Sequence, residues 1–243
     1  MSVKLKLGYT VFDPKKGMGS AKTVLKVKVK NISPDKNVQV SSKGDAYKWY
    51  AQPLTLEKSY GSYDIFTNEL PEKDVHAPEI NSQFVLKSII ANQEYWDNNH
   101  SNNYQLPYFR ATVGNNISLI KAQNVVDYQN SLSYLLGTIY VNDICFTKTV
   151  GILYSTDGGW NWRRKEAYRI GKPKIGPMGE IEGIEEWAFE TEKYPIETMP
   201  PIYMFSAYFE VNDENHPAYG DSFWDNNFSL NYVIGKNYPS VIE

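Results

Sequence analysis

The chain has 243 residues, with 25 basic and 28 acidic side chains and a formal net charge of −3, so it lacks the charge expected of a protein that binds nucleic acid or an anionic membrane. No apolar run approaches the roughly 18 residues needed to cross a bilayer. The alternating N-terminus from Met1 to Leu7 has no secretory signal core, and either an extracellular or a cytoplasmic location remains open. The single Cys145 excludes an intrachain disulfide and a cysteine-based metal cluster, and its apolar neighbours predict a buried, inert thiol.

Alternation of apolar and polar residues predicts β-strands throughout the first half. The expected strands lie at residues 3–12, within 24–40 as two runs joined by a Pro-Asp turn, at 63–66 and at 83–90. The segment from Gly17 to Thr23 ends in Lys-Thr, but no glycine directly precedes that lysine and no helical pattern follows it. A hairpin loop is therefore favoured over a phosphate-binding loop.

A segment rich in aromatic residues and amides occurs twice. Residues Tyr95–Tyr104 read YWDNNHSNNY and residues Phe223–Tyr232 read FWDNNFSLNY. Elements before the motif repeat as well, because Asn31, Lys36 and Val38 precede their matches Asp143, Lys148 and Val150 by the same interval of 112 residues. Trp160 and Trp162 stand where Trp49 stood. The motif therefore closes a repeated unit.

The repeat predicts two domains. Pro107 and Gly114–Asn116 interrupt the strand pattern, so we expect a first domain at residues 1–110 and a second at 111–243. The second copy holds about 16 more residues than the first, and the Gly- and Pro-rich loop from Gly171 to Gly183 is the expected place for many of them. No helical period is sustained, and turn signals recur every ten residues or so. The sequence thus predicts an all-β chain of two tandem β-sandwich domains.

Flat aromatic faces beside neutral amides form the surface chemistry that a sugar ring requires. We expect Trp96 and Trp224 to be exposed, because the polar Asp-Asn-Asn that follows each indicates a loop. Asp97 and Asp225 are expected to accept hydrogen bonds from loop backbone amides, as in Asx turns. For Trp49, Trp187 and one of Trp160 and Trp162, a place in the core is equally expected.

Four separated motifs of the second half occur in the order of a known family. They are Gly137–Asn142, Phe146–Val150, Asp157–Trp160 and Phe223–Asn227 continuing to Asn231 and Tyr232. In this arrangement the second half resembles a family 21 carbohydrate-binding module, and the first half is a weaker match. The resemblance implies tandem immunoglobulin-like β-sandwiches that bind α-1,4-glucan, as starch or glycogen, without cleaving it. It also implies attachment to or association with an amylolytic enzyme, since members occur on fungal glucoamylases.

The resemblance also implies the binding residues. In the second half, Trp160 or Trp162 would stack on sugar together with Trp224, and hydrogen bonds would come from Asn226, Asn231 and Lys148. The matching set in the first half is Trp49, Trp96, Asn98, Asn103 and Lys36. Two family aromatics have no match: Val85 and Ser206 stand where the family has a tyrosine, and Pro34-Asp35 replaces the aromatic present as Phe146.

Other functions need other patterns. A glycoside hydrolase, the less favoured reading, requires two carboxylates flanking a cleft, and nothing marks a pair among Glu185, Glu186 and Glu190. The histidines His76, His100 and His216 lie at spacings that form no metal motif. We therefore predict no catalytic residue, metal or cofactor. The alternative from another class is a protein-interaction or targeting module that uses the same aromatic loops.

Overall fold

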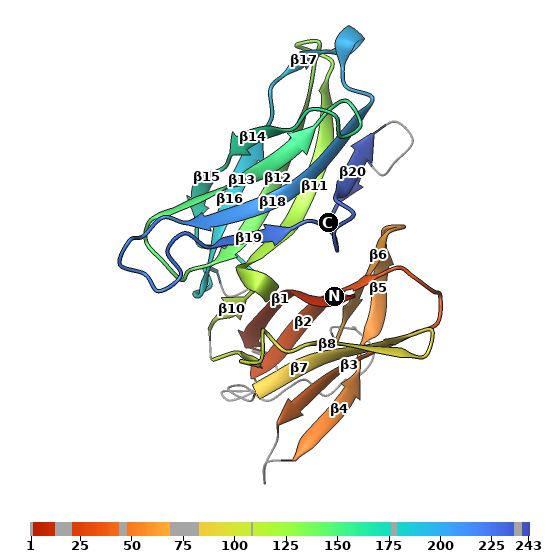
Figure 1. The fold of residues 1–243 in the computed structure, drawn as a ribbon, viewed down its shortest axis with the longest axis vertical. Coiled ribbons are helices and arrows are strands. Elements are labelled where there is room, and N and C mark those ends of the chain that lie inside the picture. Colours follow the sequence, from red (N-terminus) through yellow and green to blue (C-terminus); the bar gives the residue numbers. More distant parts are fainter. Residues whose placement is uncertain are drawn as a thin grey trace. The chain divides into compact units, whose positions relative to one another are not determined.

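The computed structural model of the chain describes residues 2–12, 21–43, 48–68, 83–107, 109–175, 179–235 and 240–243. Its regular structure consists of antiparallel strands, and the helical turns within these ranges are the short 3₁₀ turns η3 (Gly114–Asn116) and η5 (Ile196–Thr198) (Figure 1). The prediction of an all-β chain is confirmed. None of the described elements is a helix long and apolar enough to cross a membrane.

The chain forms two compact units. The first consists of Met1–Gly114 together with Pro173–Ile184, and the second of Asn115–Lys172 and Glu185–Glu243. The predicted domains, 1–110 and 111–243, placed Pro173–Ile184 in the second half. This segment joins the first unit through backbone hydrogen bonds: the Ala111 amide donates to the Glu182 carbonyl at 2.8 Å, and the Glu182 amide donates to the Phe109 carbonyl at 3.3 Å.

Two antiparallel sheets make up the first unit. One has the order β10-β1-β2-β6-β5, with β10 (Ala111–Thr112), β1 (Val3–Phe12), β2 (Ala21–Lys30), β6 (Tyr63–Thr67) and β5 (Thr55–Ser59). The other has the order β4-β3-β7-β8, with β9 also paired to β7; these strands are β4 (Trp49–Pro53), β3 (Lys36–Lys43), β7 (Gln83–Ile90), β8 (Gln93–Asp97) and β9 (Tyr104–Gln105).

The core of the first unit lies between its sheets. One cluster of buried side chains contains Leu5 and Val27 from the first sheet and Val40 and Leu86 from the second. Each of these side chains contributes about 1.5–3 kcal/mol to folding when it leaves water. Because side chains alternate along a strand, the positions between them point away from this core.

The second unit is also built from two sheets. One has the order β15-β16-β12-β11-β21, with β17 on β12; the strands are β15 (Tyr168–Gly171), β16 (Ile184–Glu190), β12 (Leu132–Asn142), β11 (Ile117–Asp127), β21 (Val241–Ile242) and β17 (Tyr194–Pro195). The other has the order β14-β13-β18-β19, with β20 on β18; the strands are β14 (Arg163–Glu166), β13 (Lys148–Ser155), β18 (Ile202–Val211), β19 (Ser222–Asp225) and β20 (Tyr232–Gly235).

Apart from β17, strand neighbours in the two units correspond one to one. In the first sheet of each unit, the order β10-β1-β2-β6-β5 corresponds to the order β21-β11-β12-β16-β15. In the second sheet, the order β4-β3-β7-β8 corresponds to β14-β13-β18-β19, and β9 on β7 corresponds to β20 on β18. The register shift between Leu5 and Leu7 recurs between Leu119 and Lys121. The same pairings in both units place equivalent residues at equivalent points.

Candidate functional site

The outer face of one sheet in each unit carries the tryptophans of the repeated motif. Along β18, Phe205 and Phe209 are fully buried in the core, so the intervening positions face outward. Tyr208 is one of these, and Trp224 of β19 lies directly opposite it. Trp224 is half-buried on that outer face. In the first unit, Trp96 lies opposite Lys87 in the same way and is 48% exposed.

A second tryptophan lies on the same face of the second unit, directly before the other edge strand. Arg163, the first residue of β14, pairs with Tyr154, so one further step places Trp162 beside Ser155, which pairs with Met204 of β18. A Cβ atom built on Gly159 would lie 3.8 Å from both Trp162 and Met204. The Trp162 indole donates to the Gly159 carbonyl at 2.9 Å. This bond holds the ring in place while leaving it 37% exposed.

The first unit has the equivalent tryptophan at Trp49. Trp49 pairs with Lys43, the last residue of β3, as Trp162 lies beside Ser155, the last residue of β13. The strand registers therefore make Trp162 the counterpart of Trp49. Trp160 lies three positions after Asp157 and is 88% exposed. Trp49 is 46% exposed, so neither it nor Trp160 is a core residue.

The asparagines of the motif form a tight loop after each central tryptophan. Asn227, Phe228, Ser229 and Asn231 all have positive φ, as do Asn99, His100, Ser101 and Asn103. Asparagine adopts this backbone conformation more readily than most residues. The loop closes on itself, because Asn227 Nδ2 donates to the Asn231 carbonyl at 3.0 Å and Asn99 Nδ2 to the Asn103 carbonyl at 3.1 Å.

The first asparagine of each loop keeps one polar group available. Asn226 Oδ1 accepts a bond from the Ser229 amide at 3.0 Å, and Asn98 Oδ1 one from the Ser101 amide at 3.1 Å. In the described part of the chain, the Nδ2 groups of Asn98 and Asn226 have no hydrogen-bond acceptor. Asn231 Oδ1 accepts from Ser206 Oγ at 2.6 Å. The loops can thus offer amide donors beside the tryptophans.

The motif aspartates fasten the loop to the facing sheet. Asp225 accepts the Leu119 amide and the Tyr232 hydroxyl, both at 2.8 Å, and Asp97 accepts the Leu5 amide at 2.8 Å. Asp97 also accepts the Asn99 amide at 3.2 Å, which is an Asx turn. The predicted Asx turn is confirmed at Asp97, and the bonds described for Asp225 link its loop to β11 and to Tyr232. Burial first, and then the Asp97 charge, raise the pKa of Tyr104, so its hydroxyl remains a donor to Asp97.

The two lysines expected to contact sugar point into the protein. Lys148 alternates with the outward positions of β13, its side chain is only 3% exposed, and its ammonium lies 3.0 Å from Glu185 and 3.2 Å from Asp143. Lys36 is 5% exposed at the side chain and binds Asp64 at 2.6 Å and Asn31 Oδ1 at 2.7 Å. This placement differs from the expected surface contact, because the Lys148 ammonium is already paired with two carboxylates and the Lys36 ammonium with one.

A hydrogen-bonded loop positions Trp160 and Trp162. Asp157 accepts the backbone amides of Trp160 at 3.1 Å and Asn161 at 3.0 Å, and also the Ser155 hydroxyl at 2.7 Å. These bonds favour the carboxylate and hold the pKa of Asp157 far below its usual value. The loop is therefore fixed by one ionised side chain.

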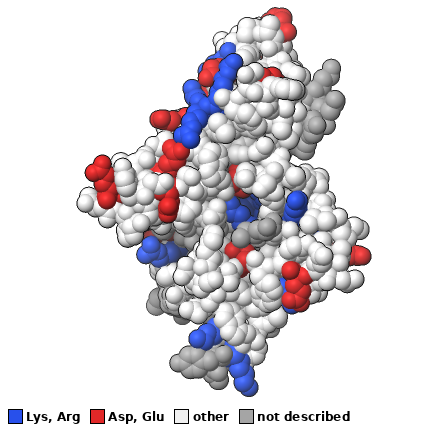
Figure 2. Space-filling view, viewed as in Figure 1, with Lys and Arg blue, Asp and Glu red and all other residues white. Residues whose placement is uncertain are grey.

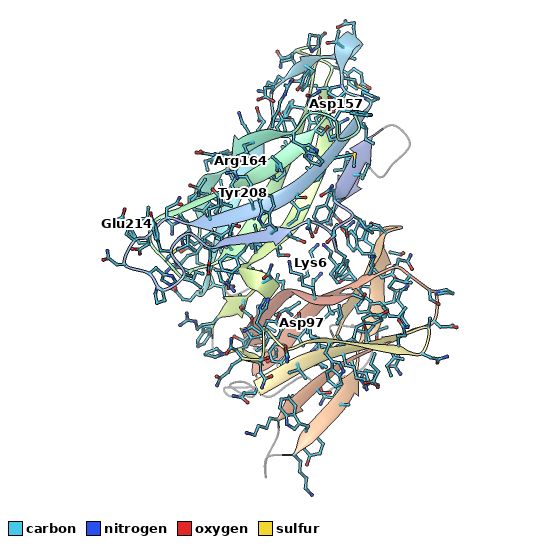
Figure 3. All side chains as sticks on the ribbon, in the orientation of Figure 1. Lys6, Asp97, Asp157, Arg164, Tyr208 and Glu214 are labelled. Atoms are coloured by element: carbon cyan, nitrogen blue, oxygen red, sulfur yellow. The ribbon has the colours of Figure 1, made fainter. Side chains whose placement is uncertain are left out.

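Sequence reasoning missed two side chains that support Trp224. The Tyr208 and Trp224 ring centroids are 5.6 Å apart, and the Arg164 guanidinium lies 4.9 Å from the Tyr208 ring centroid (Figure 3). The same guanidinium forms an ion pair with Glu210, with 2.9 Å between Nη1 and Oε1. The available signal was the two-residue alternation of β18, which puts Tyr208 on the same face as Ser206. In the first unit Lys87 occupies the corresponding place, with its ammonium 5.0 Å from the Trp96 ring.

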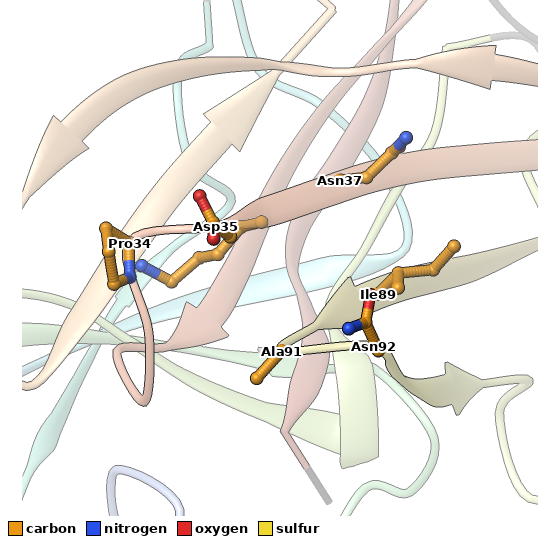
Figure 4. Close-up of a pocket in the computed structure, with 7 residues that line it drawn as sticks. Pro34, Asp35, Asn37, Ile89, Ala91 and Asn92 are labelled. Atoms are coloured by element: carbon orange, nitrogen blue, oxygen red, sulfur yellow. The ribbon is translucent and has the colours of Figure 1, made fainter.

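Other surface features are less suited to a sugar. A shallow pocket of about 430 Å³ lies where β3 begins and β7 ends, and it has no aromatic lining (Figure 4); it is lined by Pro34, Asp35, Lys36, Asn37, Ile89, Ala91 and Asn92. Figure 2 shows a mostly uncharged face with small groups of either sign. Glu185 is occupied by Lys148, Arg169 at 2.9 Å and the Trp187 indole at 3.1 Å. Within the described ranges no three His, Cys, Asp or Glu side chains are grouped to hold a metal ion, and His76 lies outside these ranges.

Comparison with known proteins gives one family match. Residues 114–235 match the model of the carbohydrate/starch-binding module (family 21). The starch-binding domain of Rhizopus oryzae glucoamylase, solved with β-cyclodextrin and maltoheptaose, is 25% identical, covers 50% of this chain and 93% of that one, and has a TM-score of 0.33. A pullulanase from Anoxybacillus sp. LM18-11, solved with maltotriose, is 11% identical over 78% of this chain and 23% of that one, with a TM-score of 0.21. No curated protein matches the chain.

Proposed function

Because the chain belongs to the family 21 carbohydrate/starch-binding modules, we propose that both of its units bind α-1,4-glucan on the outer faces just described, without cleaving it. One observation carries this proposal: in each unit two partly exposed tryptophans share a sheet face with an asparagine loop. A glucan presents apolar C–H faces that alternate with hydroxyl edges. Indole rings and neutral amides complement both.

The spacing of the tryptophans favours an oligosaccharide over a single sugar. Trp224 lies on the edge strand β19, and Trp162 directly precedes β14, the edge strand on the other side of the sheet. The two residues are four positions apart in register along β18. Strand spacing and rise then separate them by roughly 14 Å across and 13 Å along the strands, or roughly 20 Å in all. Trp49 and Trp96 have the same relation. The fitting ligand is a run of several glucose units that reaches both rings.

Within this site we assign roles from the geometry. Trp162 and Trp224, like Trp49 and Trp96, stack on sugar faces, and Trp160 provides a further exposed ring. Hydrogen bonds to hydroxyls come from the amides of Asn226 and Asn231, and from Asn98 and Asn103 in the first unit. Lys36 and Lys148 act as internal supports instead of contacts, since each ammonium is buried with its carboxylates.

The matching strand orders support a second part of the proposal, that the units are tandem copies of an immunoglobulin-like β-sandwich module. The motif aspartate, its tyrosine partner and the loop asparagines make the same bonds in both units. The family model covers only 114–235, so the first unit is assigned by these shared contacts. An amylolytic enzyme, joined to the chain or associated with it, remains the expected partner.

Affinity electrophoresis in amylopectin gels tests the proposal. The parent chain should be retarded, and Trp96→Ala plus Trp224→Ala should remove most of the retardation. A matched control, Tyr128→Ala plus Tyr168→Ala, removes two rings that are 81% and 61% exposed elsewhere in the second unit, and it should migrate as the parent does. A parent chain that is not retarded would exclude glucan binding and favour the interaction-module alternative. Release of reducing ends from soluble starch would contradict the non-catalytic assignment.

A further inference from the structure

We propose that the two units bind glucan unequally and that the second unit is the tighter site, because the residue beside the central tryptophan is Lys87 in one and Tyr208 in the other. This inference rests on the proposed function and adds a specificity-determining position to it. The two residues are true counterparts. Lys87 pairs with Trp96 next to the pair of Leu86 and Asp97, and Tyr208 pairs with Trp224 next to the pair of Ala207 and Asp225.

In the first unit the tryptophan shares its surroundings with a charged pair. The Lys87 ammonium lies 5.0 Å from the Trp96 ring centroid and forms an ion pair with Glu94, two residues before Trp96 on the same strand. Glu94 is 52% exposed at its side chain, and the bond to Lys87 holds its pKa below the usual range. A sugar that covers Trp96 must therefore remove water from this pair.

In the second unit the charge is one ring farther away. Tyr208 is only 1% exposed, and its ring lies between the Trp224 ring and the Arg164 guanidinium. Arg164 is in turn paired with Glu210. Trp224 is thus supported by a neutral ring that is already out of water, and a ligand that covers Trp224 need not desolvate an ammonium in contact with it.

The neighbouring strand makes the difference possible. Tyr208 lies opposite Gly151, where a Cβ atom would come within 2.7 Å of the Tyr208 hydroxyl oxygen. The counterpart of Gly151 in the first unit is Gln39, which lies opposite Lys87. The first unit therefore lacks the space in which a tyrosine ring would lie flat. Ala51, on β4, stands at the place of Arg164 and supplies no cation there.

These differences act in one direction on a neutral ligand. Desolvating a charged group is unfavourable unless a new partner replaces the water, and sugar hydroxyls replace it only in part. The Lys87 ammonium also interacts with the electron-rich face of the Trp96 ring, and this face would otherwise attract sugar C–H groups. The first unit meets both penalties at Trp96. The second unit avoids them at Trp224.

Isothermal titration of the full chain with maltoheptaose measures each site alone. Trp49→Ala plus Trp96→Ala leaves the second site, and Trp162→Ala plus Trp224→Ala leaves the first. We expect the second site to bind maltoheptaose about tenfold more tightly than the first. A change of this size is what a single cation–π interaction can produce when it passes from an exposed to a partly buried environment. In the chain with only the first site, Lys87→Met should raise affinity, and Lys87→Tyr with Gln39→Gly should raise it further.

The matched control is Lys58→Met, since Lys58 also lies over an aromatic ring of the first unit, 4.9 Å from Tyr60, on the other sheet. It should leave affinity unchanged. In the chain with only the second site, Tyr208→Lys should lower affinity, and an unchanged circular dichroism melt would show that folding is intact. Equal or reversed affinities at two working sites, or no effect of Lys87→Met, would overturn this inference alone. No binding by the parent chain would overturn the proposed function and this inference together.

Discussion

At the scale of single residues, the site depends on which way each side chain points. Trp224 and Lys148 belong to neighbouring parts of one sheet, yet one faces solvent and the other the interior. Alternation along β13 explains the lysine, because Lys148 shares its face with Val150 and Ile152, both of which are buried. This alternation is visible in the sequence. The family resemblance indicated the residue, and the strand periodicity indicates its direction.

The burial of Lys148 leads to a prediction that separates stability from binding. Lys148→Met should leave the Glu185 carboxylate short of its buried partner and lower the free energy of unfolding by about 3 kcal/mol, as is usual when half of a buried pair is removed. The affinity of the folded protein for maltoheptaose should not change. Urea denaturation followed by tryptophan fluorescence, and titration at low denaturant, measure the two quantities.

The control for Lys148 is Lys193→Met, which removes an exposed lysine that is paired with Glu190 and lies over the Tyr134 ring. It should change stability little, because exposed ion pairs are weak. A large loss of sugar affinity in folded Lys148→Met would return the lysine to the binding surface.

At the scale of elements, the aromatic loops are as important as the strands that carry them. Spacing along the sequence could not decide between Trp160 and Trp162, since the loop between β13 and β14 differs in length from its counterpart in the first unit. Pairing of Arg163 with Tyr154 decides the geometry, because it places Trp162 in line with Trp49. Such registers depend on contacts between strands, which a single sequence does not display.

The Asp157 loop gives a prediction at this scale. Asp157→Ala should free the backbone amides of Trp160 and Asn161, and ordering the loop again on binding should weaken the second site by about two- to tenfold. Titration of the chain that carries Trp49→Ala and Trp96→Ala measures this site alone. Asp221→Ala is the control: this exposed aspartate lies by the opposite end of β18, just before β19, and its removal should leave affinity unchanged.

The loop should also respond to acid in a defined direction. The pKa of Asp157 is depressed in the folded protein, so the contribution of its carboxylate to holding the loop is complete above the ordinary aspartate pKa of 3.8. That contribution is lost as the pH falls through the lower pKa of the folded protein. The difference in maltoheptaose affinity between the parent and Asp157→Ala should therefore persist until the pH reaches the folded pKa of Asp157, and it should narrow only at more acidic pH. A difference that disappears near neutral pH would contradict the assigned role of Asp157.

At the scale of the whole molecule, two sites on one chain should act together on a polymer. If one glucan chain can reach both units, the second binding step is intramolecular. The affinity for amylopectin should then exceed the affinity of either site alone by a factor of about 10²–10⁴. Removing either tryptophan pair should then abolish most of the gain in amylopectin affinity. On maltoheptaose the same change should remove only the binding of the one site that it disables. Proportional losses on both ligands would show that the sites work independently.

The all-β class and the repeat could be predicted because they depend on local patterns, such as the alternation in Val3–Phe12 and the recurrence of Tyr95–Tyr104 at Phe223–Tyr232. The candidate site aromatics Trp96 and Trp224 could be proposed for the same reason. Two features could not be predicted. The ring contact of Tyr208 with Trp224 and the attachment of Pro173–Ile184 to the first unit join residues far apart in sequence, and composition carries no trace of either.

The attachment of Pro173–Ile184 has a consequence for how the protein is made. During synthesis, all strands of the first unit emerge before this segment, which follows Gly114 by more than fifty residues. The backbone groups of Phe109 and Ala111 must wait for their Glu182 partners until several strands of the second unit exist. Vectorial folding of the first unit is therefore incomplete until the second is under way, and a gene fragment that stops at Gly114 encodes a unit lacking its final piece.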